Sequence, residues 1–111
     1  MLFRSLDVAG ALQARGYPPG LSVALHLEVE DELFPENQGR FVLEVERGEP
    51  QVRRGGEGHL KLHVRALAPL YTGFLSPTAL QLAGALSGDD PTLATAQSLF
   101  AGPAPAMNDM F

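Results

Sequence analysis

The chain has 111 residues, a net charge of −5 and no cysteine. This length suits one domain with its own core, and the lack of cysteine excludes both a disulfide framework and a thiolate metal site. The negative charge disfavours a nucleic-acid partner, and no apolar stretch is long enough for a membrane span or a signal peptide. We therefore expect a single cytoplasmic domain over residues 1–111, without a membrane or nucleic-acid partner.

A short helix is predicted at the start of the chain. Asp7 is a suitable N-cap, and Gly16 offers the left-handed residue that often ends a helix. The apolar residues between these two share one face of the helix, at Val8, Ala11 and Leu12. The two prolines within residues 17–20 prevent the helix from continuing and predict a rigid connection.

Strict alternation of apolar and polar residues predicts the first strand over residues 21–30. Residues 31–39 contain proline, asparagine and glycine and are predicted to form a turn-rich excursion. Alternation resumes over residues 41–46 and predicts a second strand. One face of each strand is aliphatic and the other is polar, which is typical of a sheet covered on one side.

A turn at residues 47–50 leads into a brief third strand around residues 51–53, and a fourth alternating run covers residues 60–65. Three glycines between them predict a flexible tip, at Gly55, Gly56 and Gly58. The apolar members of the alternating runs are expected to share one buried side of a single sheet: Leu21, Val23, Leu25, Leu27, Val29, Phe41, Leu43, Val45, Leu60, Leu62 and Val64.

After residue 65 the apolar spacing becomes helical. A helix over residues 66–71 is predicted with Pro69 in its first turn and Thr72-Gly73 at its end. Ser76-Pro77 and Asp90-Pro91 each join a capping side chain to a proline at the first helical position, and they predict two more helices. The expected core faces are Leu80, Ala83 and Leu86 in one helix, and Leu93, Ala96, Leu99 and Phe100 in the other.

This order of elements predicts an α+β fold. A small, mainly antiparallel sheet of four to five strands is expected, with helices on one side. No internal repeat or low-complexity segment is present, and the only separate segment is an extended carboxyl-terminal tail over residues 103–111.

Few residues in the predicted domain suggest catalysis. His26 and His63 occupy outward positions on two strands and can lie together beside Glu28 if those strands pair, but no spacing fixes a tetrahedral metal site. No phosphate-binding loop, nucleophilic serine motif or zinc-binding helix motif is present. The charged residues of the strands are typical of cross-strand pairing on a solvated face, with Glu28, Glu30, Glu44 and Glu46 facing Lys61 and Arg65.

The tail has a composition that favours docking. Prolines stiffen it, and its last five residues include three large apolar side chains, Met107, Met110 and Phe111. Such side chains lose favourable free energy when they stay in water, so the tail is expected to bind a surface. Docking onto a catalytic site would fix the α-carboxylate of Phe111, where it can accept a proton. The alternative is that these side chains pin the tail onto the core of this domain.

Four stretches also carry a family resemblance. They are the opening residues 4–17, the turn from Asp31 to Gly39, the run Leu67–Phe74, and Leu99-Phe100 followed by Pro105 and the terminal Phe111. In this order they resemble the C-terminal domain of Eis-type GNAT N-acetyltransferases, and the resemblance covers essentially the whole chain. It implies a sterol-carrier-protein-like fold, a small sheet backed by helices.

The resemblance also implies a function. In that family acetyl-CoA binds upstream of this domain, so these residues are expected to bind no cofactor themselves and not to be catalytic alone. An upstream acetyltransferase domain and an amine-bearing acceptor are the implied partners, and a homo-oligomer remains open. The carboxylate of Phe111 takes the place of the general base, with Met110 and Asp109 beside it in the cleft or as tail anchors.

A carrier function is the alternative from a different class. A stand-alone sterol-carrier-like domain can hold a lipid or another apolar ligand between its sheet and its helices. The aromatic terminus favours the acetyltransferase interpretation, because a lipid carrier does not need it, and a Ser-Lys-Leu-type peroxisomal signal is absent. We expect Leu and Phe side chains to fill the interior without a continuous tunnel.

Overall fold

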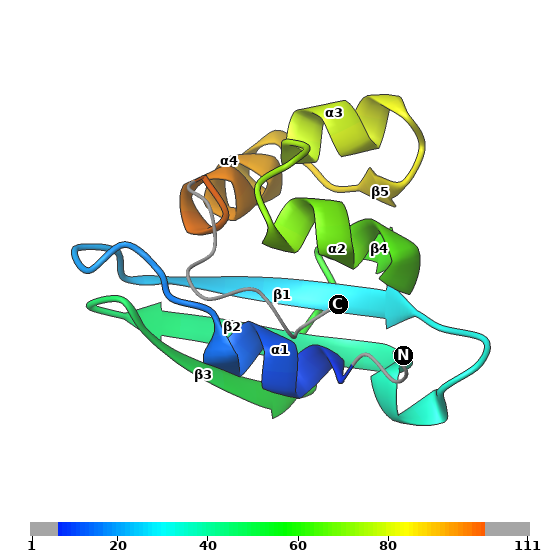
Figure 1. Ribbon diagram of the computed structural model, residues 1–111, viewed down its shortest axis with the longest axis horizontal. Helices are drawn as coiled ribbons and strands as arrows, with labels where there is room; N and C mark the ends of the chain where they lie inside the picture. Colours follow the sequence, from blue (N-terminus) through cyan, green and yellow to red (C-terminus); the bar gives the residue numbers. More distant parts are fainter. Residues whose placement is uncertain (1–6, 102–111) are drawn as a thin grey trace.

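The computed structural model describes residues 7–101 and consists of one sheet with four α-helices (Figure 1). The sheet has five strands in the order β3-β2-β1-β4-β5. β1 and β4 run parallel, whereas the other three pairings are antiparallel. In chain order the elements are α1 (Val8–Ala14), β1 (Val23–Glu30), the 3-10 helix η1 (Pro35–Asn37), β2 (Gly39–Glu46), β3 (Glu49–Arg54), β4 (Leu60–His63), α2 (Val64–Tyr71), α3 (Pro77–Leu82), β5 (Leu86–Ser87) and α4 (Asp90–Leu99). The predicted α+β class and mainly antiparallel sheet are confirmed.

The alternation in β1 and β2 decides which face of the sheet is buried. Leu25 pairs with Leu43 and Leu27 with Phe41, and none of these side chains is more than 2% exposed. Glu44, on the opposite face, is exposed. The predicted inward face is therefore confirmed for the central pair of strands, as expected when successive side chains point to opposite sides.

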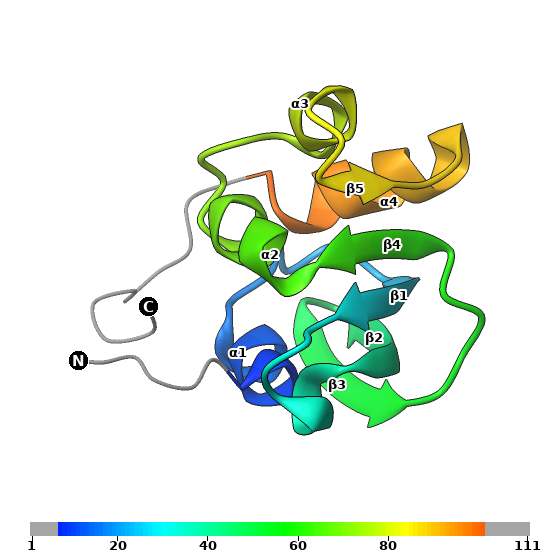
Figure 2. The same cartoon turned by 90° about the vertical axis from the view of Figure 1, so that its right-hand side faces the viewer.

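One hydrophobic cluster joins this face to all four α-helices. Leu12 of α1, Leu67 of α2, Leu80 of α3 and Leu99 of α4 are all buried in it. Figure 2 shows α1 and α2 on one side of the sheet, with the connection from β3 to β4 on the other. The apolar side chains that a lipid carrier would need as cavity lining thus pack against one another.

The connection from β3 to β4 is not the tip predicted from its glycines. Because β4 pairs with β1, residues 55–59 must pass β2 and β1 to reach it. A Cβ atom on Gly56 would lie 2.5 Å from Cγ2 of Val42 and 2.7 Å from Nδ1 of His26, and Gly56 has a φ of +93°. The connection therefore covers the second face of the sheet closely enough to bury Val42 completely, although alternation predicts a solvated position for it.

We expect Gly56→Ala to lower the free energy of unfolding by about 2–3 kcal/mol, because the added methyl group meets both Val42 and His26 and the left-handed backbone is strained. Gly55→Ala is the matched control, since Gly55 also has a positive φ of +112° but a Cβ there has no atom within 4 Å. Urea unfolding of both variants measures the difference. Equal stability of the two variants would contradict the close crossing.

The start of α1 is as predicted, but its end is not. The Asp7 side chain caps the helix by accepting a hydrogen bond from the N–H of Gly10 at 3.2 Å. The helix ends at Ala14, and its C-cap Arg15 has an extended backbone (φ −74°, ψ 142°), so Gly16 does not end it in a left-handed conformation. Burial of the Arg15 side chain accompanies this exit, and a local glycine signal cannot anticipate a tertiary contact.

α2 begins two residues before its predicted start. Its N-cap is His63, whose Nδ1 accepts a hydrogen bond from the N–H of Arg65 at 3.1 Å. Val64 therefore belongs to this helix and not to β4, and Pro69 lies beyond the first turn. Without an N–H, Pro69 cannot donate to the carbonyl of Arg65 four residues earlier, and Arg65 is the one exposed residue of this helix.

The last two helices also differ from the prediction in detail. Ser76 caps α3 as expected, but the helix ends at Leu82, so Leu86 lies in β5 and Ala83 is exposed. α4 is capped by Asp89, which accepts the N–H of Thr92 at 3.0 Å, and not by Asp90. Both aspartates qualify by residue type, and the backbone geometry selects the earlier one. The predicted core face of α4 is confirmed, with Leu93, Ala96, Leu99 and Phe100 buried.

Candidate functional site

The predicted catalytic terminus, Phe111, and its neighbours Met110 and Asp109 lie outside the described residues, as does the tail over residues 103–111. The structure describes the part of the domain from which this segment continues, at the carboxyl end of α4. The candidate site is therefore built from the residues that hold that end in place.

Arg15 joins the ends of α2 and α4. Its Nε donates a hydrogen bond to the carbonyl of Tyr71 at 2.7 Å, and its Nη1 donates to the carbonyls of Gly16 at 2.8 Å and Leu99 at 3.3 Å. Carbonyl groups in the last turn of a helix lack intrahelical partners and carry partial negative charge. A guanidinium that is only 4% exposed thus satisfies two helix ends at once.

Aromatic rings surround this guanidinium. Its Cζ lies 5.5 Å from the ring centroid of Tyr17, 5.7 Å from that of Tyr71 and 5.3 Å from that of Phe100. Burial lowers the pKa of Arg15, but an arginine stays protonated in proteins. Burial also raises the pKa of Tyr17. The cation therefore lies over the electron-rich faces of the rings, an arrangement that stabilises a buried positive charge. We call Arg15, Tyr17, Tyr71, Leu99 and Phe100 the helix-end cluster.

The sequence analysis assigned no functional role to Arg15 or Tyr71. The hydrogen bonds of Arg15 reach residues 56 and 84 positions away in the chain, so no local spacing could reveal them. The only sequence signal is that both residues lie within the stretches that carry the family resemblance.

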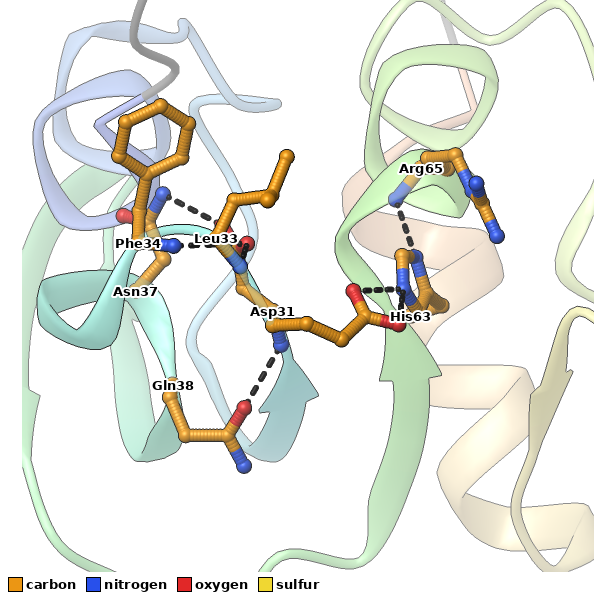
Figure 3. Close-up of polar contacts among 8 residues, drawn as sticks. Asp31, Leu33, Phe34, Asn37, Gln38, His63 and Arg65 are labelled. Atoms are coloured by element: carbon orange, nitrogen blue, oxygen red, sulfur yellow. Dashed lines mark hydrogen bonds and ion pairs between the residues drawn. The ribbon is translucent and has the colours of Figure 1, made fainter.

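The turn between β1 and β2 is a second ordered element (Figure 3). The carboxylate of Asp31 accepts hydrogen bonds from the N–H groups of Leu33 at 3.0 Å and Phe34 at 3.1 Å, and from Nδ2 of Asn37 at 3.0 Å. Oδ1 of Asn37 in turn accepts the N–H of Val8 at 3.1 Å, which ties the turn to the start of α1. This network fixes a turn whose Leu33 side chain is 79% exposed.

Asp31 should contribute stability that depends on pH. Burial raises the pKa of its carboxyl group, but the hydrogen bonds from Asn37, Leu33 and Phe34 outweigh burial and hold the pKa below its ordinary value of 3.8. A group with a lowered pKa in the folded state stabilises the fold above its unfolded-state pKa. That contribution is lost as the pH falls through the folded-state pKa.

We expect Asp31→Ala to lower the free energy of unfolding at pH 7 by about 2 kcal/mol, because buried hydrogen bonds to a charged acceptor are lost. The difference from the unmodified chain should shrink below about pH 4, where that chain loses the same contribution. Glu36→Ala is the control, since this carboxylate of the same turn is exposed. Denaturant unfolding at both pH values measures the effect, and a difference that persists unchanged at low pH would contradict it.

The histidines do not form the pair considered from the sequence. β1 and β4 do pair, but their register places His63 beside Glu30, and Nε2 of His63 lies 2.9 Å from Oε1 of Glu32. His26 instead stacks against His59, with ring centroids 5.0 Å apart. Within residues 7–101, no group of three histidine, aspartate or glutamate side chains is arranged to hold a metal ion.

The glutamates on the solvated face of the sheet form ion pairs within β1, β2 and β3. Glu28 contacts Arg40 at 3.1 Å, and Glu44 contacts Arg53 at 3.5 Å. Cross-strand pairing on a solvated face is thus observed, but these pairs use arginines of β2 and β3 and not Lys61 or Arg65. All four side chains are at least 38% exposed, and such pairs contribute at most about 1 kcal/mol.

A shallow pocket of about 230 Å³ lies between α1 and the β2–β3 hairpin. Four of its five lining side chains are polar or charged, with Val52 as the exception: Gln13, Glu44, Gln51 and Arg53. Lipid sites are predominantly apolar, so this pocket does not suit a lipid. None of the helices within residues 7–101 has the length and apolar character required to cross a bilayer.

Comparison with known proteins places this fold in a family. Three solved structures resemble it: a GCN5-related N-acetyltransferase from Anabaena variabilis (46% identity, TM-score 0.85), one from Kribbella flavida (32%, 0.81) and Eis1 from Mycobacterium abscessus (32%, 0.75). The matches cover 89%, 92% and 92% of this chain, but the chain spans only 26%, 26% and 25% of theirs. No curated protein matches significantly. The resemblance to Eis-type acetyltransferases is confirmed. Since residues 8–108 match the family described as the sterol carrier protein domain, the chain belongs to that family.

Proposed function

We propose that this chain is the accessory C-terminal domain of a GNAT-type N-acetyltransferase and helps to form the cleft for the acceptor amine. The observation that carries the proposal is its relation to three solved acetyltransferases at 32–46% identity, over nearly all of this chain but about a quarter of theirs. The remaining length corresponds to the acetyl-CoA-binding module, which we place upstream in the same protein. We expect the whole enzyme to act in the cytoplasm.

In this proposal the α-carboxylate of Phe111 is the general base. The acceptor amine attacks the carbonyl carbon of the acetyl thioester, the carbon–sulfur bond breaks, and the nitrogen must lose a proton. An α-carboxylate has an ordinary pKa of roughly 3.5, so it is ionised at neutral pH and can take that proton directly or through water. Met110 and the ring of Phe111 anchor the carboxylate, and Asp109 lies beside them in the chain.

The helix-end cluster supports this role. A general base must be held accurately in position relative to the reacting nitrogen. A tail can hold it there only if the point at which the tail leaves the domain is itself fixed. Arg15 holds the end of α4 against α1 and the end of α2 through buried hydrogen bonds. The described part of the domain thus offers a rigid platform from which a short segment can reach a neighbouring cleft.

We expect the 111-residue chain alone to show no micromolar affinity for acetyl-CoA, because it has no glycine-rich turn opening a helix that could hold the pyrophosphate. Calorimetric titration tests this directly. The complete protein, including its upstream region, should bind acetyl-CoA and acetylate an amine. A complete protein that transfers no acetyl group to any amine tested would refute the proposed function.

Carriage of an apolar ligand is the second candidate, and the family match is the observation that favours it. Mass spectrometry of extracts from the purified chain distinguishes the two functions. A fatty acid or sterol that copurifies in stoichiometric amount would favour the carrier, whereas the acetyltransferase proposal expects none.

A further inference from the structure

Three large apolar side chains on the described surface are nearly fully exposed. Leu33 is 79% exposed, Phe74 81% and Leu82 85%. They lie on different elements: the turn between β1 and β2, the loop between α2 and α3, and the end of α3. Burying a side chain of this kind is worth about 1.5–3 kcal/mol, so each is a possible contact point for a partner.

Phe74 differs from the other two in its position relative to the tail. It follows three residues after Tyr71, whose carbonyl shares the Arg15 guanidinium with the carbonyl of Leu99. Both views show the loop between α2 and α3 beside the carboxyl end of α4 (Figures 1 and 2). Phe74 is therefore exposed on the surface from which the tail continues.

The loop that carries Phe74 has a fixed backbone. Thr72 Oγ1 donates a hydrogen bond to the carbonyl of Ala68 at 3.0 Å, and the N–H of Leu75 donates to the carbonyl of Pro69 at 3.2 Å. Gly73 supplies the left-handed conformation between them, with a φ of +76°. An exposed ring on an ordered loop loses little conformational freedom on binding, which favours its use as an anchor.

We propose that Phe74 and its neighbour Leu75, itself 37% exposed, dock in an apolar recess of the catalytic acetyltransferase module of the same protein. This inference rests on the proposed function, in which Phe111 works in the cleft of that module. The ten residues 102–111 span at most about 35 Å when fully extended, so in this proposal the cleft of the module lies within that distance of Ala101. A module that contacts the surface around Ala101 would also cover the loop that carries Phe74.

Thiol protection tests the inference. The chain has no cysteine, so a single introduced thiol reports on one place in this domain. In the complete enzyme, Phe74→Cys, Leu82→Cys and Leu33→Cys are treated with the same thiol reagent, and the labelled peptides are quantified by mass spectrometry. The three positions are matched because their side chains are almost equally exposed within the domain.

We expect the thiol introduced by Phe74→Cys to react roughly tenfold more slowly than the other two, because the centre of an interface excludes water. Equal rates at all three positions would overturn the inference, and so would protection confined to Leu33→Cys, which places the module on the turn between β1 and β2.

Failure of this inference can be told apart from failure of the proposed function. Labelling needs no catalytic activity, whereas the proposed function stands or falls on acetyl transfer by the unmodified complete protein. An active enzyme with an unprotected thiol from Phe74→Cys refutes the docking surface alone. An enzyme that transfers no acetyl group refutes the proposed function, whichever thiol is protected.

Discussion

A single glycine added after Phe111 is expected to reduce the turnover of the proposed complete acetyltransferase about 100-fold while leaving its folding stability unchanged. The extension keeps every side chain of the tail but moves the terminal charge by about 3.5 Å, one residue along the chain. A misplacement of only ~1 Å can cost ~100-fold in rate when a catalytic group acts by position. Steady-state acetyl transfer, followed beside thermal unfolding, measures both quantities.

Asp109→Asn is the matched change within the same tail. It removes a side-chain carboxylate two residues from the end and keeps the terminal one, so we expect a much smaller fall in turnover. An extended variant with full activity would remove Phe111 from the mechanism and leave its ring as a plain apolar anchor. A lower melting temperature of the extended variant would indicate that the terminus stabilises the fold and does not act in catalysis.

Replacement of Arg15 by methionine is expected to lower the free energy of unfolding by about 3 kcal/mol. Methionine retains length and apolar volume but donates no hydrogen bond to the carbonyls of Tyr71 and Leu99. A buried acceptor left without a donor costs about 1–3 kcal/mol. Denaturant unfolding of the 111-residue chain measures the change, and Arg65→Met is the control because Arg65 is an exposed arginine of α2.

Arg15→Lys separates charge from geometry at the same position. Lysine retains the positive charge but lacks the planar fork with which arginine reaches several carbonyls at once, so an intermediate loss is expected. If Arg15→Met were as stable as the unmodified chain, the carbonyls at the ends of α2 and α4 would not depend on this side chain. The helix-end cluster would then lose its role as the platform of the tail.

The sheet was largely predictable because its signal is local. In β1, each residue from Leu25 to Glu30 differs in polarity from its neighbours in a way that fixes its face, and Leu25 and Leu27 are buried as expected. The starts of α1 and α3 were equally accessible, because a capping side chain such as Ser76 acts within three residues of itself.

The features that the sequence did not reveal depend on distant contacts. The parallel pairing of β1 with β4 forces residues 55–59 across the second face of the sheet, and this buries Val42 at a position that alternation assigns to solvent. The same pairing separates His26 from His63. The two residues of β5 are too few to show a period, so Leu86 was assigned to a helix.

The candidate site was predictable only in part, for a similar reason. The composition of the tail and the family resemblance point to Phe111, and the comparisons confirm the family. Arg15, by contrast, gains its role from carbonyl groups that belong to other helices. A side chain whose partners are backbone atoms leaves no pattern in residue types.

The two edges of the sheet have a consequence for how copies of this domain associate. An edge strand with unpaired N–H and C=O groups is a template for strand addition and aggregation. At one edge, β5 has only two residues. At the other edge, the N–H of Val52 in β3 donates to Oε1 of Gln13 at 3.1 Å, and Pro50, two residues earlier on the same side of the strand, has no N–H. Strand addition is therefore disfavoured at both edges of the sheet within residues 7–101.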